Sequence, residues 1–221
     1  MSLRRCTDRE SLASAGRGLV LAAFVLLLAA CASPGPKVEG KQGRSTAAPA
    51  EFGADVPPEV QTLYEQAVAV MAAGDFVEAE LRLKEFLLQY PGYPGAHVNL
   101  AIIHREGGND AAAHADIDAA LAIDPNNAAA LNQKGLLLRR SGNFLEAEAA
   151  YLKAVTASPE YALAHYNLGV LNELYLQRLD VALQHFETYQ ALVGNDEQVE
   201  RWITDLRRRV AANQRTANVA E

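Results

Sequence analysis

The sequence predicts an all-α protein built from stacked pairs of helices. A glycine, an alanine and a proline each recur three times at a fixed step of 34 residues. The three sets are Gly74, Gly108 and Gly142, then Ala79, Ala113 and Ala147, then Pro91, Pro125 and Pro159. A period of this length is typical of helix pairs that are too small to bury an apolar face alone and therefore stack on one another. Such stacks form binding surfaces more often than reaction centres.

The first expected segment is a secretory signal over residues 1–30. Arginines precede an uncharged run of twelve residues from Leu19 to Ala30. Such a run spans about 18 Å as an α-helix, which is too short for the roughly 30 Å hydrocarbon core of a bilayer. The pattern therefore favours a cleaved signal over a mature membrane-spanning helix.

The end of this run, Leu28-Ala29-Ala30-Cys31, resembles the lipobox of bacterial lipoproteins. In that family the polypeptide is cut before the cysteine, which is then acylated, so the resemblance implies a palmitate-bearing lipid anchor at Cys31. Ala32 follows where an aspartate would favour retention at the inner membrane. We therefore expect a domain on the bacterial outer membrane that faces the periplasm. The alternative is an ordinary signal peptide with an unmodified Cys31.

Residues 31–58 are expected to form a flexible tether that begins at the lipidated cysteine. Prolines and glycines alternate there with a few charges, and no apolar period appears. A linker of this length reaches about 30 Å on average.

Four helix pairs are expected over residues 59–195. With residue 60 as position 1 of the first repeat, position 8 is always small, and so is position 20 up to a one-residue shift in the last repeat. Small residues there let the two helices of a pair cross closely. The recurring glycine ends the first helix, Asp or Asn after it can cap the second helix, and the proline stops that helix.

These positions resemble the tetratricopeptide repeat (TPR) family, and the resemblance covers residues 60–195. It implies a right-handed superhelical solenoid in which the first helix of each pair lines a concave face. The fourth repeat departs from the pattern, because Leu174 to Arg178 carries one extra residue and no turn glycine. Phe86 also stands where a small residue is usual, so the first repeat is expected to pack atypically.

After the repeats we expect a capping helix over residues 196–213 and a disordered tail over residues 214–221. Val199, Trp202, Ile203, Leu206 and Val210 form a helical stripe for packing on the last repeat. The arginine run over residues 207–209 is either a partner patch or a solvated helix end.

The TPR resemblance also implies which side chains line the concave groove, at positions 5, 9, 12 and 13 of the first helices. The expected groove residues are Tyr64, Val68, Met71, Val98, Ile102, Arg105, Asn132, Leu136, Arg139, Arg140, Tyr166, Val170 and Glu173. This groove would be apolar and aromatic with an arginine centre, suited to a peptide with apolar anchors and an acidic residue. The alternative is that the apolar residues at position 9 pack between neighbouring helices.

Other classes of function are disfavoured. The net charge of −7 argues against a nucleic-acid ligand. The sequence has no arrangement typical of nucleophilic catalysis, zinc peptidases or phosphate-binding loops, so we expect no enzyme and no cofactor. His97 and His104 lie seven apart and could hold zinc, but a core or edge histidine is the preferred interpretation, and no metal is expected.

The sequence therefore predicts a lipid-anchored adaptor that binds a protein or peptide. Lipid-anchored TPR proteins of this kind are similar to pilotins of pilus secretins, to adaptors of peptidoglycan-processing enzymes and to partners of TonB-type systems. The alternative is a passive envelope tether or homo-oligomeric scaffold without a recognition groove.

Overall fold

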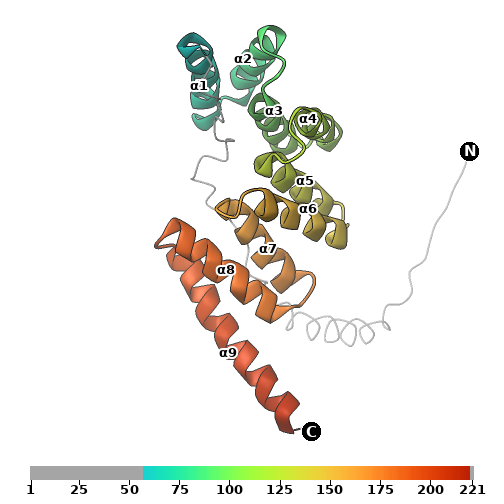
Figure 1. Ribbon diagram of the computed structural model, residues 1–221, viewed down its shortest axis with the longest axis vertical. Helices are drawn as coiled ribbons and strands as arrows, with labels where there is room; N and C mark the ends of the chain where they lie inside the picture. The colour runs from blue at the N-terminus through green and yellow to red at the C-terminus, as the bar shows by residue number, and fades with distance from the viewer. Residues whose placement is uncertain (1–56, 220–221) are drawn as a thin grey trace, which may run out of the picture. The chain divides into compact units, whose positions relative to one another are not determined.

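The structure is a computed structural model that describes residues 57–219, and these residues form nine α-helices (Figure 1). The helices are α1 (Pro58–Ala72), α2 (Phe76–Gln89), α3 (Pro94–Glu106), α4 (Asp110–Ile123), α5 (Ala128–Arg140), α6 (Phe144–Ala157), α7 (Ala162–Leu174), α8 (Leu179–Val193) and α9 (Glu197–Val219). Every element in this range is a helix, which confirms the all-α prediction. The expected signal segment, Cys31 and the tether up to residue 56 lie outside the described residues, as do residues 220–221.

The first eight helices form four hairpins that follow one another along the stack (Figure 1). Each odd-numbered helix packs on the next even-numbered helix, and α1, α3, α5 and α7 also pack on one another in succession. This second set of contacts makes α1, α3, α5 and α7 the inner helices, as expected for the first helices of the repeats.

The turn inside each of the first three hairpins depends on its glycine. Gly74, Gly108 and Gly142 have φ of 86°, 75° and 82°, a region that favours glycine because it lacks a Cβ. The residue after the glycine caps the second helix in two of the three turns. The side chain of Asp75 accepts a hydrogen bond from Glu78 N, and that of Asn109 accepts one from Ala112 N.

The third and fourth turns differ from this pattern. In the third turn, the Asn143 side chain donates to the hydroxyl of Ser141 instead of capping α6. The fourth turn holds the extra residue, and there Gln177 adopts a φ of 55° in place of a glycine. The amide of Arg178 donates to the carbonyl of Asn172 at 2.8 Å, so the longer turn still closes between α7 and α8.

The small residues at positions 8 and 20 lie in the core, as predicted. At position 20, Ala79, Ala113, Ala147 and Ala182 are fully buried. Position 8 changes from alanine in the first two repeats to glycine in the last two. Gly135 lies against the ring of Tyr151 and Gly169 against that of Phe186.

The first hairpin has its own aromatic core around Phe86. The ring of Phe86 lies 5.6 Å from that of Tyr64, 5.3 Å from that of Tyr90 and 5.2 Å from that of Tyr93, measured between centroids. The sequence predicts atypical packing of the first repeat because of Phe86, and the structure shows this packing as an aromatic cluster around that residue.

Helix α9 packs on α8 and covers the C-terminal end of the stack. Val199, Ile203 and Leu206 are buried against Phe186 and Tyr189 of α8. The helix continues to Val219, six residues beyond the expected end at 213, because residues 214–219 contain neither proline nor glycine.

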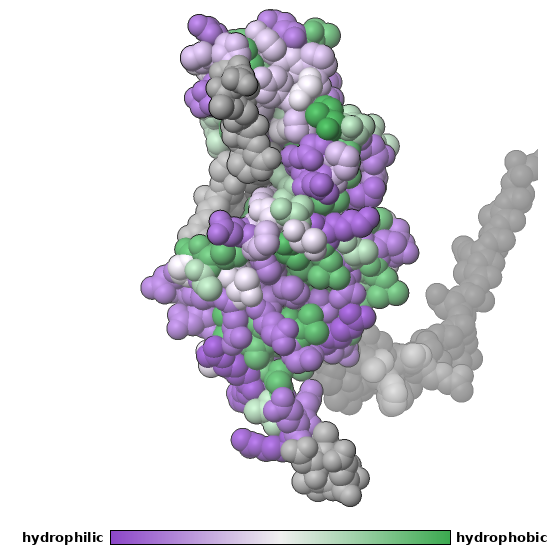
Figure 2. All heavy atoms as spheres, in the orientation of Figure 1, coloured by the Kyte–Doolittle hydropathy of each residue, from purple (hydrophilic) through white to green (hydrophobic). Residues whose placement is uncertain are grey.

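The surface drawn in Figure 2 is mostly hydrophilic, with apolar residues in small separate areas. Within residues 57–219, no helix is both long and apolar enough to cross a membrane.

Candidate functional site: an arginine centre on the inner helices

The structure buries six of the thirteen residues that we expected to line the groove. These are Tyr64, Met71, Val98, Ile102, Asn132 and Val170. They correct the expectation, because a buried side chain packs the inner helices together and offers a partner little surface. Their positions were derived from the repeat register, which says which helix carries a residue but not how far its neighbour covers it.

Two of these buried residues serve as hydrogen-bond partners between successive inner helices. The amide of Asn99 on α3 donates to the hydroxyl of Tyr64 on α1 at 2.7 Å. The amide of Asn167 on α7 donates to the amide oxygen of Asn132 on α5 at 2.8 Å. Buried polar groups need such partners, so these side chains fix the stacking of the hairpins.

Three apolar groove candidates are half-buried. Val68, Leu136 and Tyr166 each pack at the border of a hydrophobic cluster while part of the side chain stays accessible. The ring of Tyr166 lies 5.3 Å from that of Tyr189 and 6.1 Å from that of Trp202. The accessible apolar surface on the inner helices is therefore smaller than the sequence predicts.

Two of the charged groove candidates are bound internally. Arg140 donates to the carbonyl of Arg105 at 3.1 Å and lies 3.4 Å from the carboxylate of Asp110. Glu173 pairs with Arg209 of α9 at 2.7 Å. These two side chains therefore hold the repeats and the capping helix together.

Arg105 and Arg139 are the remaining groove candidates, and they occupy position 12 on α3 and α5. The side chain of Arg105 is only 11% exposed and contacts Glu106 through one nitrogen at 2.7 Å. Within the described part of the protein, the Arg139 side chain makes neither an ion pair nor a hydrogen bond. Nε of Arg105 and Nη1 of Arg139 are both buried without an acceptor among residues 57–219.

Tyr151 on α6 packs against Gly135, which lies one turn before Arg139 on α5, and the repeat register does not predict this neighbour of the arginines. Its side chain is fully buried and its hydroxyl has no hydrogen-bond partner among the described residues. Burial raises the pKa of Tyr151 to about 12, while the positive charges of Arg139 and Arg105 act in the opposite direction. Gly135 is the sequence feature that could have indicated Tyr151, because a glycine leaves space for a large ring on the facing helix. We call Arg105, Arg139 and Tyr151 the arginine centre.

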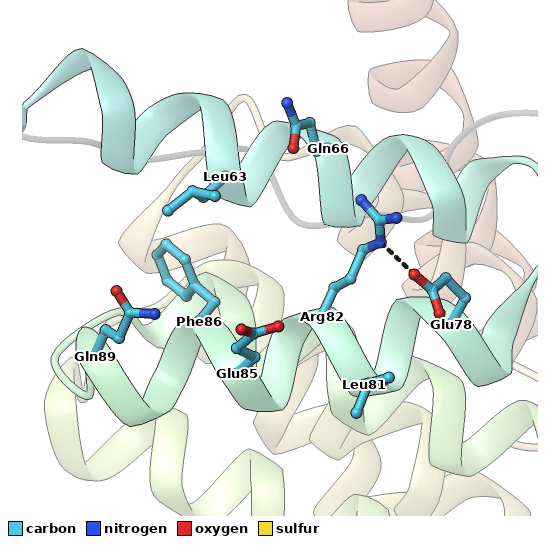
Figure 3. Close-up of a pocket in the computed structure, with 8 residues that line it drawn as sticks. All are labelled: Leu63, Gln66, Glu78, Leu81, Arg82, Glu85, Phe86 and Gln89. Carbon is cyan, nitrogen blue, oxygen red and sulfur yellow. Dashed lines mark hydrogen bonds and ion pairs between the residues drawn. The ribbon is translucent and has the colours of Figure 1, made fainter.

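A separate hollow of about 230 Å³ lies between α1 and α2, at the N-terminal end of the stack. Figure 3 shows Leu63 on α1 pointing towards Phe86 on α2, while Arg82 rises from α2 towards α1 beside Glu78. Leu63 is 45% exposed, whereas Leu131 and His165, at the same position of later repeats, are buried. The hollow is thus the place that a preceding hairpin would fill.

His97 and His104 lie beside acidic side chains, and no metal cluster forms among the described residues. Nδ1 of His104 lies 2.7 Å from Asp116, and Nδ1 of His97 lies 3.7 Å from the same carboxylate. No group of three or more His, Cys, Asp or Glu side chains in residues 57–219 is placed to hold a metal.

His165 and His185 form a second pair, between α7 and α8. Their Nδ1 atoms lie 3.1 Å apart, and Nε2 of His165 lies 3.1 Å from the carbonyl of Pro159. Because a carbonyl only accepts, Nε2 of His165 carries the proton and its Nδ1 accepts from His185. Burial lowers the pKa of His185, and the nearby His165 lowers it further.

The arginine run of α9 has internal partners. Arg207 pairs with Glu187 of α8 at 2.7 Å, and Arg208 pairs with Asp205. With Arg209 bound to Glu173, all three arginines have acidic partners within the described range, which favours the solvated helix end over a partner patch.

Two family models match the protein, and both are described as tetratricopeptide repeat. One covers residues 70–136 and the other residues 132–197, which together make up more than half of the sequence. The fold and the inner surface define the class, a helical-hairpin repeat scaffold for protein–protein interaction. The chain belongs to the tetratricopeptide repeat family.

Solved structures share this fold. PilF of Pseudomonas aeruginosa is 26% identical with a TM-score of 0.61, and the match covers 71% of this chain and 73% of PilF. MamA of Desulfovibrio magneticus is 19% identical with a TM-score of 0.55, over 73% and 91% of the two proteins. The first TPR domain of Spaghetti (RPAP3), bound to an HSP90 peptide, is 19% identical with a TM-score of 0.50, over 53% and 95%. The last two show the fold alone, and no curated protein matches this sequence.

Proposed function

We propose that this protein is a lipid-anchored adaptor of the bacterial envelope, which holds a polypeptide partner against its inner helices. The observation that carries the proposal is the arginine centre. Two guanidinium groups lie there on the inner helices, and buried nitrogens of both have no acceptor in the described part of the protein. Arg105 pairs with Glu106, and Arg140 and Arg209 have acidic partners as well, whereas Arg139 has none in the described part of the protein. A scaffold that needed Arg139 only for its own folding would be expected to neutralise it in the same way.

The fold of a peptide-bound relative supports the same conclusion. The TPR domain of Spaghetti is bound to an HSP90 peptide, so a stack of this kind can bind a peptide segment of another protein. In the present sequence, Tyr64 and Val68 stand at the positions where chaperone-binding TPR proteins carry Lys and Asn. We therefore propose a partner other than a chaperone tail.

The partner is tested by crosslinking in intact cells, followed by capture of the full-length protein from the envelope. We compare the wild type with a variant that carries both Arg139→Glu and Arg140→Glu. The adaptor function predicts that the double substitution removes at least one captured protein. An unchanged set of partners would favour the passive tether.

The anchor is proposed at Cys31, because that residue closes the lipobox and is followed by Ala32 and Ser33. Outer-membrane attachment and a periplasmic domain follow from the same motif. The test is fractionation of Cys31→Ala cells grown with labelled palmitate. The wild type should carry label in the outer-membrane fraction, and the variant should lose both label and attachment; a variant that keeps them would refute the anchor.

Three envelope systems are candidates for the partner of this adaptor: a pilus secretin, peptidoglycan-processing enzymes and a TonB-type system. Identification of the captured proteins by mass spectrometry distinguishes the three.

A further inference from the structure

The first hairpin leaves an apolar surface open at the N-terminal end of the stack. Leu63 of α1 and Leu81 of α2 line the hollow between these helices, and Leu81 is 63% exposed. Val77 and Leu88 lie on the same face of α2 as Leu81 and are more exposed still. We call these four residues the N-terminal apolar surface. Large apolar side chains gathered on one accessible face mark an interaction site.

The fold of α2 does not account for its two exposed leucines. Helices α4 and α6 are the outer helices of the next two repeats, and they carry smaller residues at both places. The equivalents of Leu81 and Leu88 are Ala115, Ala149, Ala122 and Thr156. An outer helix of this stack therefore forms without a leucine there, so the leucines of α2 are available for a contact with another polypeptide.

The shape of this end suits a helix. Within the stack, the second helix of each hairpin packs on the first helix of the next, as α2 does on α3, α4 on α5 and α6 on α7. Leu131 of α5 occupies the repeat position of Leu63, and Leu121 of α4 packs against the cluster that contains it. Helix α1 has no preceding helix packed on it among residues 57–219. A partner helix laid against α1 and α2 would fill that place.

The first hairpin is acidic. Residues 57–93 carry six acidic and two basic side chains. Both basic side chains are paired within α2, Arg82 with Glu78 at 2.7 Å and Lys84 with Glu80. The hairpin therefore has no cation left over to balance its other carboxylates.

Two of these carboxylates lie beside the hollow. Glu85 of α2 lines it, and Glu59 precedes Leu63 by one turn on the same face of α1. Both side chains are exposed, and neither has a cationic partner in the described part of the chain. An apolar surface with an acidic border favours a partner that is apolar in the middle and basic at its edges.

Two other occupants have the wrong charge. The first hairpin of a second copy is as acidic as this one, and residues 201, 207, 208 and 209 of its α9 are arginines with acidic partners of their own. Residues 45–56 directly precede the described range and carry Glu51 and Asp55 but no lysine or arginine. Neither a second copy nor this segment would neutralise Glu59 and Glu85.

We propose that the N-terminal apolar surface binds a basic amphipathic helix of another protein. Its large aliphatic side chains would lie on Leu63 and Leu81, and lysines or arginines beside them would face Glu59 and Glu85. This surface lies at the end of the stack and uses no residue of the arginine centre. It goes beyond the proposed function, because it gives the protein a second place to hold a polypeptide.

The test measures binding of labelled helical peptides of about 18 residues by fluorescence anisotropy. One peptide has leucines on one face and lysines beside them, the second has glutamates in place of the lysines, and the third has serines in place of the leucines. The full-length protein is held in nanodiscs of zwitterionic lipid, and empty nanodiscs give the background. We expect the basic peptide to bind about tenfold more tightly than the acidic one or better, and the serine peptide not to bind.

Matched variants assign the surface. Leu81→Gln should weaken binding of the basic peptide by about tenfold or more, because the leucine would be buried in the complex. Leu145→Gln on α6 is the control, since Leu145 is 61% exposed and lies away from the first hairpin, and it should leave binding unchanged. Melting curves of each variant establish that it is folded.

A charge reversal tests the acidic border. A variant with both Glu59→Lys and Glu85→Lys should bind the acidic peptide more tightly than the basic one. The reversal is a gain of binding for one peptide, so a loss of structure cannot imitate it.

Four outcomes would overturn the proposal. The first two are no binding of the basic peptide by the wild type and an equal loss in Leu81→Gln and Leu145→Gln. The third is a disulfide-linked dimer formed on oxidation by Leu81→Cys and not by Leu145→Cys, which would assign the surface to a second copy. The fourth is binding that appears only when residues 45–56 are replaced by glycine and serine, which would assign it to that segment. The envelope capture judges the adaptor function independently, because its variant alters only α5.

Discussion

Gly135 and Gly169 occupy the same repeat position, and each lies under an aromatic ring of its own hairpin. An ideal Cβ on Gly135 would lie 2.4 Å from the Tyr151 ring, and one on Gly169 would lie 2.7 Å from the Phe186 ring. The first two repeats have the opposite combination, in which Ala67 and Ala101 share their clusters with Leu83 and Ile117. The size of the residue at position 8 is thus matched to the side chain opposite.

Gly135→Ala should lower the free energy of unfolding by about 1–3 kcal/mol, because the added methyl overlaps the Tyr151 ring. Adding Tyr151→Ile recreates the combination of the second repeat and should recover part of that loss. Urea unfolding measures all three proteins. Gly92→Ala is the control, since its Cβ would meet nothing within 4 Å. A double variant no more stable than Gly135→Ala alone would contradict the size match.

Tyr151 should also make the protein sensitive to alkali. An unfolded tyrosine ionises near pH 10 and folded Tyr151 near 12, so unfolding releases a proton between these values. Its contribution to stability is complete below pH 10 and is lost as the pH rises towards 12. Burial also raises the pKa of Tyr64 and Tyr166, which act in the same direction.

Urea unfolding from about pH 9 to about pH 11.5 measures this effect. Each buried tyrosine should add up to about 1.4 kcal/mol per pH unit to the fall in stability. Tyr151→Phe should therefore show a shallower fall than the wild type. Parallel curves for the two proteins would show that Tyr151 ionises normally in the folded state.

At the scale of elements, the contact between α7 and α8 includes the hydrogen-bonded pair of His165 and His185. One proton lies between the two Nδ1 atoms. Burial disfavours a positive charge on His185. Glu148 of α6 acts in the opposite direction and favours protonation of His185. This contact is therefore the part of the stack that we expect to be sensitive to acid.

Because the folded state holds the pKa of His185 below 6.5, the unfolded polypeptide takes up the proton first as the pH falls. Stability from this group is complete above pH 6.5 and is lost as the pH falls through the lower folded value. His185→Asn keeps an amide donor for His165 and removes the titrating group. It should lose less stability than the wild type between about pH 7.5 and about pH 5, measured by urea unfolding. An equal loss in both proteins would exclude His185 as the cause.

At the scale of the whole molecule, the stability of each hairpin should depend on its neighbour, because each hairpin packs on the next. Removing α9 by ending the protein after Asn195 exposes Phe186 and Tyr189 of α8. Amide hydrogen exchange should then quicken in α7 and α8 far more than in α1 and α2. Ending the protein after Ala211 keeps the packed stripe of α9 and serves as the control. Equal acceleration along the whole stack would indicate a single cooperative unit.

Most of this architecture could be predicted from the sequence, because helix ends depend on local chemistry. The step of 34 residues located the turns at Gly74, Gly108 and Gly142 and the ends of the second helices before each proline. The site was harder to predict. The repeat register placed Arg105 and Arg139 on the inner helices, but it also suggested residues such as Val98 and Ile102, which the neighbouring helices bury.

Tyr151 was missed for a related reason. It lies on an outer helix, so the register gave no ground to place it at an inner site. Its ring lies against Gly135 of α5, because a glycine lets the two helices of that hairpin approach closely. Pairings that depend on such side-chain reach, including Arg209 with Glu173, are set by three-dimensional packing and not by spacing along the sequence.

The two ends of the stack are unequal, and this determines where the protein can grow. Helix α9 closes one end, whereas the hollow beside Leu63 leaves the other ready to receive one more hairpin. A duplicated 34-residue unit inserted ahead of Pro58 would be placed to pack on Leu63 and Leu81, which line this hollow. Gene duplication or protein engineering can therefore extend this protein at its N-terminal side, away from the C-terminal end that α9 covers.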